Sequence, residues 1–279
     1  MKKISRRSFL AAAGLSVAAL ALTACGGSSA STASSVASSA ASSEAASTSA
    51  AAGELTTVEA GKLTMATNAA FPPYEMTTDA GEFEGIDIET AQAIADKLGL
   101  ELQIDDMDFD AALLSVQQGK ADIVMAGVTV TDERKAVMDF SDSYATGIQS
   151  IIVPEGSDIA SPDDLTDKKI GTQRGTTGYI YCSDDFGDDN VVAYDDGLTA
   201  VQALNNGQVD AVVIDNAPAK EFVAANPGLV ILDTSYAEED YAIGMAKGSS
   251  LEDAINAALE ELKADGTLQS IVDKYITAE

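Results

Sequence analysis

A short internal repeat constrains the fold of this chain more than any other feature. The segment LLSVQQGKADIV (residues 113–124) has a counterpart in VQALNNGQVDAV (residues 201–212). Each copy has the pattern of an amphipathic helix, a glycine turn and an apolar strand. The first strands of the two halves also correspond, because residues 62–67 and 169–172 each run into a loop that ends in a tyrosine. The repeat therefore predicts two similar α/β halves.

Strand and helix patterns alternate around the first copy. Residues 62–67 read as a strand, and residues 87–98 as a helix with acids in its first turn and Gly99 at its end. Residues 100–104 alternate as a strand, and a second helix runs from Phe109 to a stop at Gly119. Such a βαβ series predicts a parallel sheet covered by helices.

The repeat also makes two strand ends equivalent. Gly127 ends the apolar strand of the first copy, and Asp215 ends the strand of the second. In parallel sheets, ligands bind at the carboxyl ends of the strands. Two lobes that face one another across a cleft would bring both ends to one ligand. The 225 residues from Leu55 onward are long enough for two lobes of about 100 residues each.

The N-terminus has the pattern of an export signal. Four basic residues precede an apolar run, residues 9–24, which is shorter than the roughly 20 residues of a membrane-spanning helix. We expect residues 1–24 to be a signal peptide. LTAC, ending at Cys25, resembles a lipobox and predicts a lipidated cysteine. Residues 25–54 would then be a Ser/Ala-rich tether. SRRSFL (residues 5–10) resembles a twin-arginine motif and fits an ordinary basic n-region equally well.

Composition excludes several classes of function. Four of the 16 basic side chains lie in residues 1–24, so 12 remain against 45 acidic ones, a net charge of −33. Nucleic acid is not an expected partner. The chain has no histidine, which removes the commonest zinc ligand and the usual general base, so we expect no metal, no cofactor and no catalytic residue. Cys182 reads as a minor core or surface residue.

The segment AGVTVTDERKAVMDFSDSYATG (residues 126–147) carries the chemistry. Hydroxyls follow the strand at Thr129 and Thr131, and Arg134 opens a short helix. An arginine fork takes a carboxylate through two parallel hydrogen bonds. TVTDER followed by DFSDSY resembles the signature of the extracytoplasmic solute-binding proteins of polar amino-acid ABC transporters, solute-binding family 3. The likeness runs from about Gly61 to Tyr275.

The resemblance implies an α/β fold of the periplasmic-binding-protein-like type II class, with two lobes, a hinge and a ligand cleft between the lobes. Lobe 1 would comprise residues 55–146 and 241–279, and lobe 2 residues 147–240. The hinge would lie near residues 144–148 and 239–243. It also implies a monomer, lipid-anchored outside the bacterial cell membrane, that delivers a free amino acid to the permease and ATPase of an importer.

The resemblance further implies a set of ligand-binding residues. Arg134 would hold the ligand carboxylate with the backbone N–H groups of Thr129 and Thr177. Asp215 would pair with the ammonium, together with the Gly127 carbonyl and the Thr129 hydroxyl. Two rings would cover the ligand side chain, and two amides would lie beside it. The full set is Asn68, Phe71, Phe109, Gly127, Thr129, Arg134, Gln173, Thr177 and Asp215.

The sequence leaves open which amino acid is bound and whether the protein serves transport, catalysis or sensing. Relatives that bind cationic amino acids often carry an aspartate at the position of Asn68, and Gln173 is also neutral. These residues favour a polar, uncharged ligand such as glutamine; cystine, serine-like and cationic ligands remain alternatives, because acids elsewhere in lobe 2 can reach the pocket. Two further alternatives are an enzyme resembling cyclohexadienyl dehydratase, and a ligand sensor for a membrane signalling partner.

Overall fold

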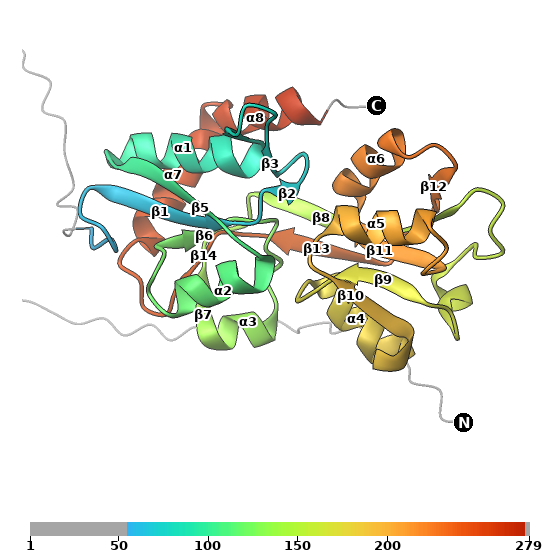
Figure 1. Ribbon diagram of the computed structural model, residues 1–279. Coiled ribbons are helices and arrows are strands. Elements are labelled where there is room, and N and C mark those ends of the chain that lie inside the picture. The colour runs from blue at the N-terminus through green and yellow to red at the C-terminus, as the bar shows by residue number, and fades with distance from the viewer. Residues whose placement is uncertain (1–54, 277–279) are drawn as a thin grey trace, which may run out of the picture. The chain divides into compact units, whose positions relative to one another are not determined.

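The computed structural model describes residues 55–276, which form two α/β lobes (Figure 1). Each lobe is a sheet with helices packed against it. The chain builds most of the first lobe, passes into the second, and returns to complete the first. This is the two-lobed type II architecture predicted from the sequence. Within residues 55–276, no helix has both the length and the apolar character to cross a membrane.

The sheet of lobe 1 has the strand order β5-β1-β6-β14-β7. β1 is parallel to β5 and β6, and β14 is antiparallel to β6 and β7. The strands are β1 (Lys62–Thr67), β5 (Glu101–Asp106), β6 (Ile123–Val124), β7 (Met138–Phe140) and β14 (Gly244–Ala246). A small antiparallel sheet joins β2 (Ala70–Phe71), β3 (Glu75–Thr77) and β4 (Phe83–Glu84).

Helices cover both faces of this sheet, because side chains alternate along β1. Leu63 and Met65 belong to the core on one face, where α1 packs against α7 and α8, and Ala66 belongs to the core on the other face, against α2. Figure 1 shows these helices on the two sides of the sheet. All three strand residues are fully buried. The helices are α1 (Ile86–Leu98), α2 (Phe109–Gln117), α3 (Asp132–Val137), α7 (Glu252–Ala264) and α8 (Thr267–Tyr275).

The sheet of lobe 2 has the order β10-β9-β11-β8-β12, with β13 also paired to β8. Its strands are β8 (Ala145–Pro154), β9 (Ile170–Gln173), β10 (Val191–Tyr194), β11 (Ala211–Asp215), β12 (Leu229–Ile231) and β13 (Ala237–Tyr241). Its helices are α4 (Thr177–Phe186), α5 (Gly197–Asn205) and α6 (Asn216–Ala225), with 3₁₀ turns at η1 (Pro162–Leu165) and η2 (Asp188–Asn190). Cys182 is fully buried in this lobe's core.

Two antiparallel strands, β8 and β13, run between the lobes (Figure 1). Ala145 lies opposite Tyr241, and Gly147 lies opposite Glu239. A Cβ atom added to Gly147 would lie 2.4 Å from the ring of Tyr241, which is itself buried. Only glycine fits beside this ring, so the crossing is a closely packed pair of strands.

One predicted strand end is wrong. The apolar strand was expected to reach Gly127, but β6 ends at Val124. The physical reason is a side-chain hydrogen bond. The N–H of Gly127 donates to Oδ2 of the buried Asp87 at 3.0 Å, and Gly127 has a φ of 55°. The backbone therefore turns out of the sheet before Gly127, in a conformation that favours glycine.

Candidate functional site

A pocket between the two lobes brings together all nine residues singled out from the sequence. The lining side chains lie close together, and the free volume of the pocket is about 20 Å³. Several residues that the sequence did not single out also line it: Glu75, Ala126, Gln149, Thr176, Val213, Ile214 and Tyr241. Cys25, the predicted lipidation site, lies outside the described residues.

Arg134 is buried at the start of α3. Its backbone N–H donates to the side chain of Thr131, the residue that caps the helix. Nη1 donates to the carbonyl of Thr129 at 2.8 Å, and Nη2 to the carbonyl of Gly175 at 3.1 Å. The guanidinium also lies 5.4 Å from the ring centre of Phe109. Burial lowers the pKa of Arg134, but an arginine remains charged in a protein. The pocket therefore contains an oriented positive charge.

Asp215 ends β11 and also caps α6. Oδ1 accepts the N–H of Ala217 at 3.0 Å, and Oδ2 accepts the N–H of Ile148 at 2.7 Å. Burial raises the pKa of Asp215 to about 6, against the opposing effect of these hydrogen bonds. The aspartate is thus both a helix cap and part of the pocket wall, and its position is fixed by backbone donors.

The N-terminus of α4 also lies at the pocket. Thr176 and Thr177 both line it, and the side chain of Thr176 accepts the N–H of Tyr179 at 3.3 Å as the helix cap. α4 is a helix of ten residues. Because the first N–H groups of a helix have no partner within the helix, its first turn presents backbone donors and the positive end of the helix dipole. This arrangement favours an anionic group in the pocket.

Two amides meet across the pocket. Nε2 of Gln173 in lobe 2 donates to Oδ1 of Asn68 in lobe 1 at 2.8 Å. Nδ2 of Asn68 in turn donates to the carbonyl of Met107 at 3.0 Å. Both amide groups are therefore oriented by bonds within the protein.

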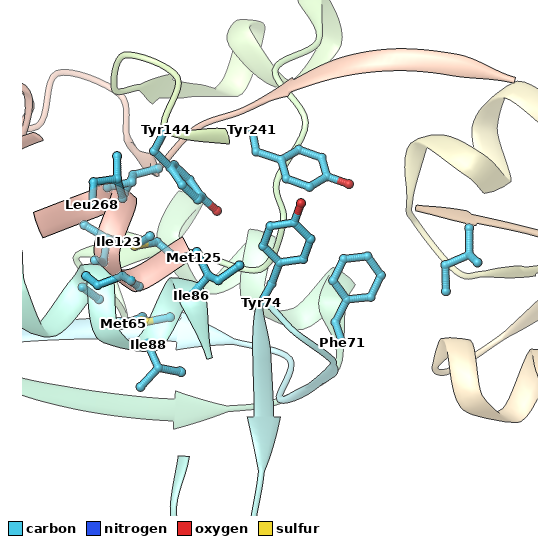
Figure 2. Packing of buried hydrophobic residues seen from close by; sticks show 14 of the residues in the cluster. Met65, Phe71, Tyr74, Ile86, Ile88, Ile123, Met125, Tyr144, Tyr241 and Leu268 are labelled. Atoms are coloured by element: carbon cyan, nitrogen blue, oxygen red, sulfur yellow. The ribbon is translucent and has the colours of Figure 1, made fainter. Parts of the chain in front are cut away.

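Aromatic rings form the wall on the side of lobe 1. Phe71 stacks on Tyr74 with ring centres 5.9 Å apart, and Tyr74 meets Tyr241 edge to face at 5.4 Å. Figure 2 shows these three rings at the edge of the lobe 1 core, beyond Ile86 and Met125. The rings join the core of the lobe to the pocket, and give a ligand side chain apolar cover.

Glu75, in β3, is an acid of the pocket that the sequence did not reveal. Its side chain is fully buried beside the carboxyl group of Asp87, and among residues 55–276 no N–H or hydroxyl group donates to its oxygens, so the carboxyl of Asp87 is its hydrogen-bonding neighbour. Burial, with Asp87 close by, raises the pKa of Glu75 well above its usual range. Asp87 itself accepts from Gly127 and from the hydroxyl of Tyr144 at 2.8 Å. The only available signal was the position of Glu75 directly after FPPY.

Among residues 55–276, no group of three or more histidine, cysteine or acidic side chains is arranged to hold a metal ion. The acidic and basic residues that line the pocket are Glu75, Arg134 and Asp215. The site therefore offers one cation, two acids, a helix N-terminus and aromatic walls to a small molecule.

Comparison with known proteins agrees with this geometry. The chain is 33% identical over 276 residues to the "Probable histidine-binding protein" of Neisseria gonorrhoeae, covering 96% of this chain and 95% of the relative. The structure of "An ancestral arginine-binding protein bound to arginine" is 43% identical, covers 77% of this chain and 98% of its own, and has a TM-score of 0.74.

"An ancestral arginine-binding protein bound to glutamine" is 42% identical, covers 78% of this chain and 99% of its own, and has a TM-score of 0.75. Residues 63–278 match the family described as bacterial extracellular solute-binding proteins, family 3. The match covers most of the chain, and the relatives are named for the amino acids that they bind. The chain therefore belongs to the bacterial extracellular solute-binding proteins of family 3.

Proposed function

We propose that this protein binds a free amino acid in the pocket between its lobes, outside the cytoplasmic membrane, and delivers it to the permease and ATPase of an ABC importer. The charges of the pocket support a zwitterion. Arg134 and the N-terminus of α4 suit a carboxylate, and Asp215 suits an ammonium. In this proposal the nine pocket residues that were predicted from the sequence bind the ligand, and none of them is catalytic.

The observation that carries the proposed choice of ligand side chain is the buried Glu75 in the pocket lining. Once Arg134 and Asp215 have paired with the zwitterion, Glu75 is the remaining acidic group of the pocket lining. Burial and Asp87 favour its neutral form, and a cationic ligand side chain beside it would stabilise the charged form. Arginine is therefore the leading ligand. Names of relatives support a basic ligand, since they include histidine-binding and arginine-binding proteins.

Glutamine is the second candidate, and the amide pair favours it. Asn68 and Gln173 are neutral and bond to one another. A protonated Glu75 has both a donor and an acceptor for a ligand amide. An ancestral relative has been solved with glutamine bound as well as with arginine.

Isothermal titration calorimetry with L-arginine and L-glutamine separates the two. Glu75→Gln should weaken arginine binding by roughly tenfold or more, because it removes the partner of the ligand cation, and should leave glutamine binding within about threefold. Glu84→Gln, an exposed glutamate in β4, is the matched control. Unchanged arginine affinity in Glu75→Gln would exclude this role for Glu75.

The cellular setting belongs to the same proposal. Residues 1–24 direct export, Cys25 carries the lipid anchor, and residues 25–54 tether the two lobes to the membrane. Lobe 1 comprises residues 55–146 and 241–279, and lobe 2 residues 147–240, with the hinge in the crossing strands. The protein works as a monomer in this arrangement.

A further inference from the structure

We infer that Glu239 is a positioning residue that makes the pocket select ligands with an α-ammonium group. It does so by fixing the hydroxyls of Thr129 and Thr177 as hydrogen-bond acceptors. The inference rests on the proposed function, namely that the pocket takes a free amino acid. It adds Glu239, which would act on the ligand through Thr129 and Thr177.

Glu239 lies on β13, one of the two strands that cross between the lobes, and is 6% exposed. A single oxygen, Oε2, accepts three hydrogen bonds. The donors are Oγ1 of Thr129 at 3.1 Å, Oγ1 of Thr177 at 2.9 Å and Nε2 of Gln149 at 3.0 Å. Thr129 belongs to lobe 1 and Thr177 to lobe 2, so one carboxylate holds a hydroxyl from each side of the pocket.

The direction of these bonds decides what the threonines offer to a ligand. A hydroxyl has one proton and two lone pairs, and a carboxylate only accepts. When Thr129 and Thr177 both donate to Glu239, only their lone pairs remain for the pocket that they line. The two oxygens lie 3.4 Å apart, so one hydroxyl can also donate to the other; in either arrangement both protons are used within the protein, and lone pairs remain for the ligand. An ammonium can donate to such a pair, but a ligand carboxylate cannot use it.

The same arrangement fixes the orientation of the ligand. Its carboxylate must take the N–H donors of Arg134 and of the first turn of α4, because the hydroxyl protons are already used. Glu239 also places a negative charge near Arg134, since it raises the pKa of that guanidinium against the effect of burial. An additional anion at this place favours a ligand that brings its own positive charge.

The test compares an amino acid with its deaminated analogue. Calorimetry would measure L-arginine against 5-guanidinopentanoate, and L-glutamine against 4-carbamoylbutanoate, with wild type and Glu239→Gln. An amide in place of the carboxylate frees the threonine protons and removes the charge. We expect Glu239→Gln to weaken the amino acid by roughly tenfold or more and the analogue by less than about threefold. Glu238→Gln, the exposed neighbour on β13, is the matched control and should change neither.

A purely structural role predicts a different result, because both ligands would then weaken by the same factor and their ratio would stay constant. A constant ratio overturns the inference. In a Thr129→Val/Thr177→Val background, Glu239→Gln should change the ratio much less than it does in wild type, since the hydroxyls are gone and only the loss of the charge remains. If Glu239→Gln fails to fold, Thr177→Val replaces it: an unchanged ratio in that variant also overturns the inference. If wild type binds no amino acid, the proposed function fails, and this inference with it.

Discussion

Gln173 donates its side-chain amide to Asn68 across the pocket at 2.8 Å, and this bond joins lobe 2 to lobe 1. Asn68 uses its oxygen toward Gln173 and its nitrogen toward Met107. An aspartate at this position can keep the first bond, because an acid oxygen still accepts from Gln173. The second oxygen of the aspartate cannot donate to Met107, so the added charge replaces that hydrogen bond.

Asn68→Asp should shift selectivity toward cationic amino acids. An additional anion near the ligand side chain attracts a lysine or arginine cation, and gives no such benefit to glutamine. We expect the affinity for lysine relative to glutamine to rise by roughly tenfold, measured by calorimetry at one ionic strength. Asn205→Asp adds the same charge at an exposed position of α5 and serves as the control. An unchanged ratio would show that position 68 does not sense the ligand side chain.

Arg134→Ala should abolish tight binding while the fold remains. Loss of one partner of a buried charge pair costs roughly 3–5 kcal/mol, which is about two to three and a half orders of magnitude in Kd. Circular dichroism checks the fold, and calorimetry checks the affinity. Arg174→Ala removes an exposed arginine of the same chain and should bind as wild type does. A Kd for Arg134→Ala within about threefold of wild type would rule out the carboxylate role.

Asp215→Asn should weaken amino acids more than their deaminated analogues. Asparagine is also a good N-cap, so α6 keeps its cap while the charge that faces the ammonium is lost. We expect a loss of roughly tenfold or more for the amino acid and a much smaller loss for the analogue. Equal losses for both ligands would mean that Asp215 does not contact the ammonium.

The ligand-free protein should become more stable as the pH falls from 7 to 5. Asp87 and Asp215 have pKa values raised to about 6 in the folded protein, against an unfolded value near 3.9. Between about pH 4 and pH 6 the folded state therefore binds more protons at these two groups than the unfolded state, so their contribution to stability falls as pH rises through this window. Each group contributes about 3 kcal/mol over the whole window, of which roughly half appears between pH 7 and pH 5, and the raised pKa of Glu75 acts in the same direction.

Urea unfolding at pH 5 and pH 7 measures this effect. Asp215→Asn removes one of the two groups, so its gain in unfolding free energy between pH 7 and pH 5 should be smaller than that of wild type. A midpoint that is equal or lower at pH 5 would contradict the prediction. The comparison of the two proteins separates these carboxyls from the general relief of charge repulsion at lower pH.

Cys25→Ser should release the protein from membranes of a native host. A lipid anchor supplies the hydrophobic attachment, and the acidic chain has no attraction to an anionic bilayer. Fractionation followed by immunoblotting measures the distribution. Retention of the variant in the membrane fraction to the same extent as wild type would argue against lipidation at Cys25.

Much of the fold follows from local pattern. The strand at residues 62–67 has the bounds of β1, and the helix expected at residues 87–98 is α1 with one additional residue. The repeat predicted that Gly127 and Asp215 lie at one pocket, and they do, although β6 ends three residues before Gly127. These features depend on periodicity and on strand direction, and both are visible in a sequence.

The two buried glutamates of the pocket region, Glu75 and Glu239, could not be predicted in this way. Glu75 follows a short loop and is buried only because lobe 1 closes around it. Glu239 stands between Glu238 and Asp240, and three acids in a row look alike in a sequence. Its inward direction comes from strand register, since it alternates with its neighbours and shares a face with the buried Tyr241. That alternation was the signal that could have found it.

The strand order of lobe 1 also has a consequence for the sequence of events during folding. β14 lies between β6 and β7, and α7 and α8 cover the same sheet, so lobe 1 needs residues from the end of the chain. Lobe 2 is continuous from β8 to β13. When the chain is synthesised from its N-terminus, lobe 2 can therefore fold completely first. The sheet of β1, β5 and β6 stays incomplete until β14 has been made. Lobe 1 starts first and finishes last.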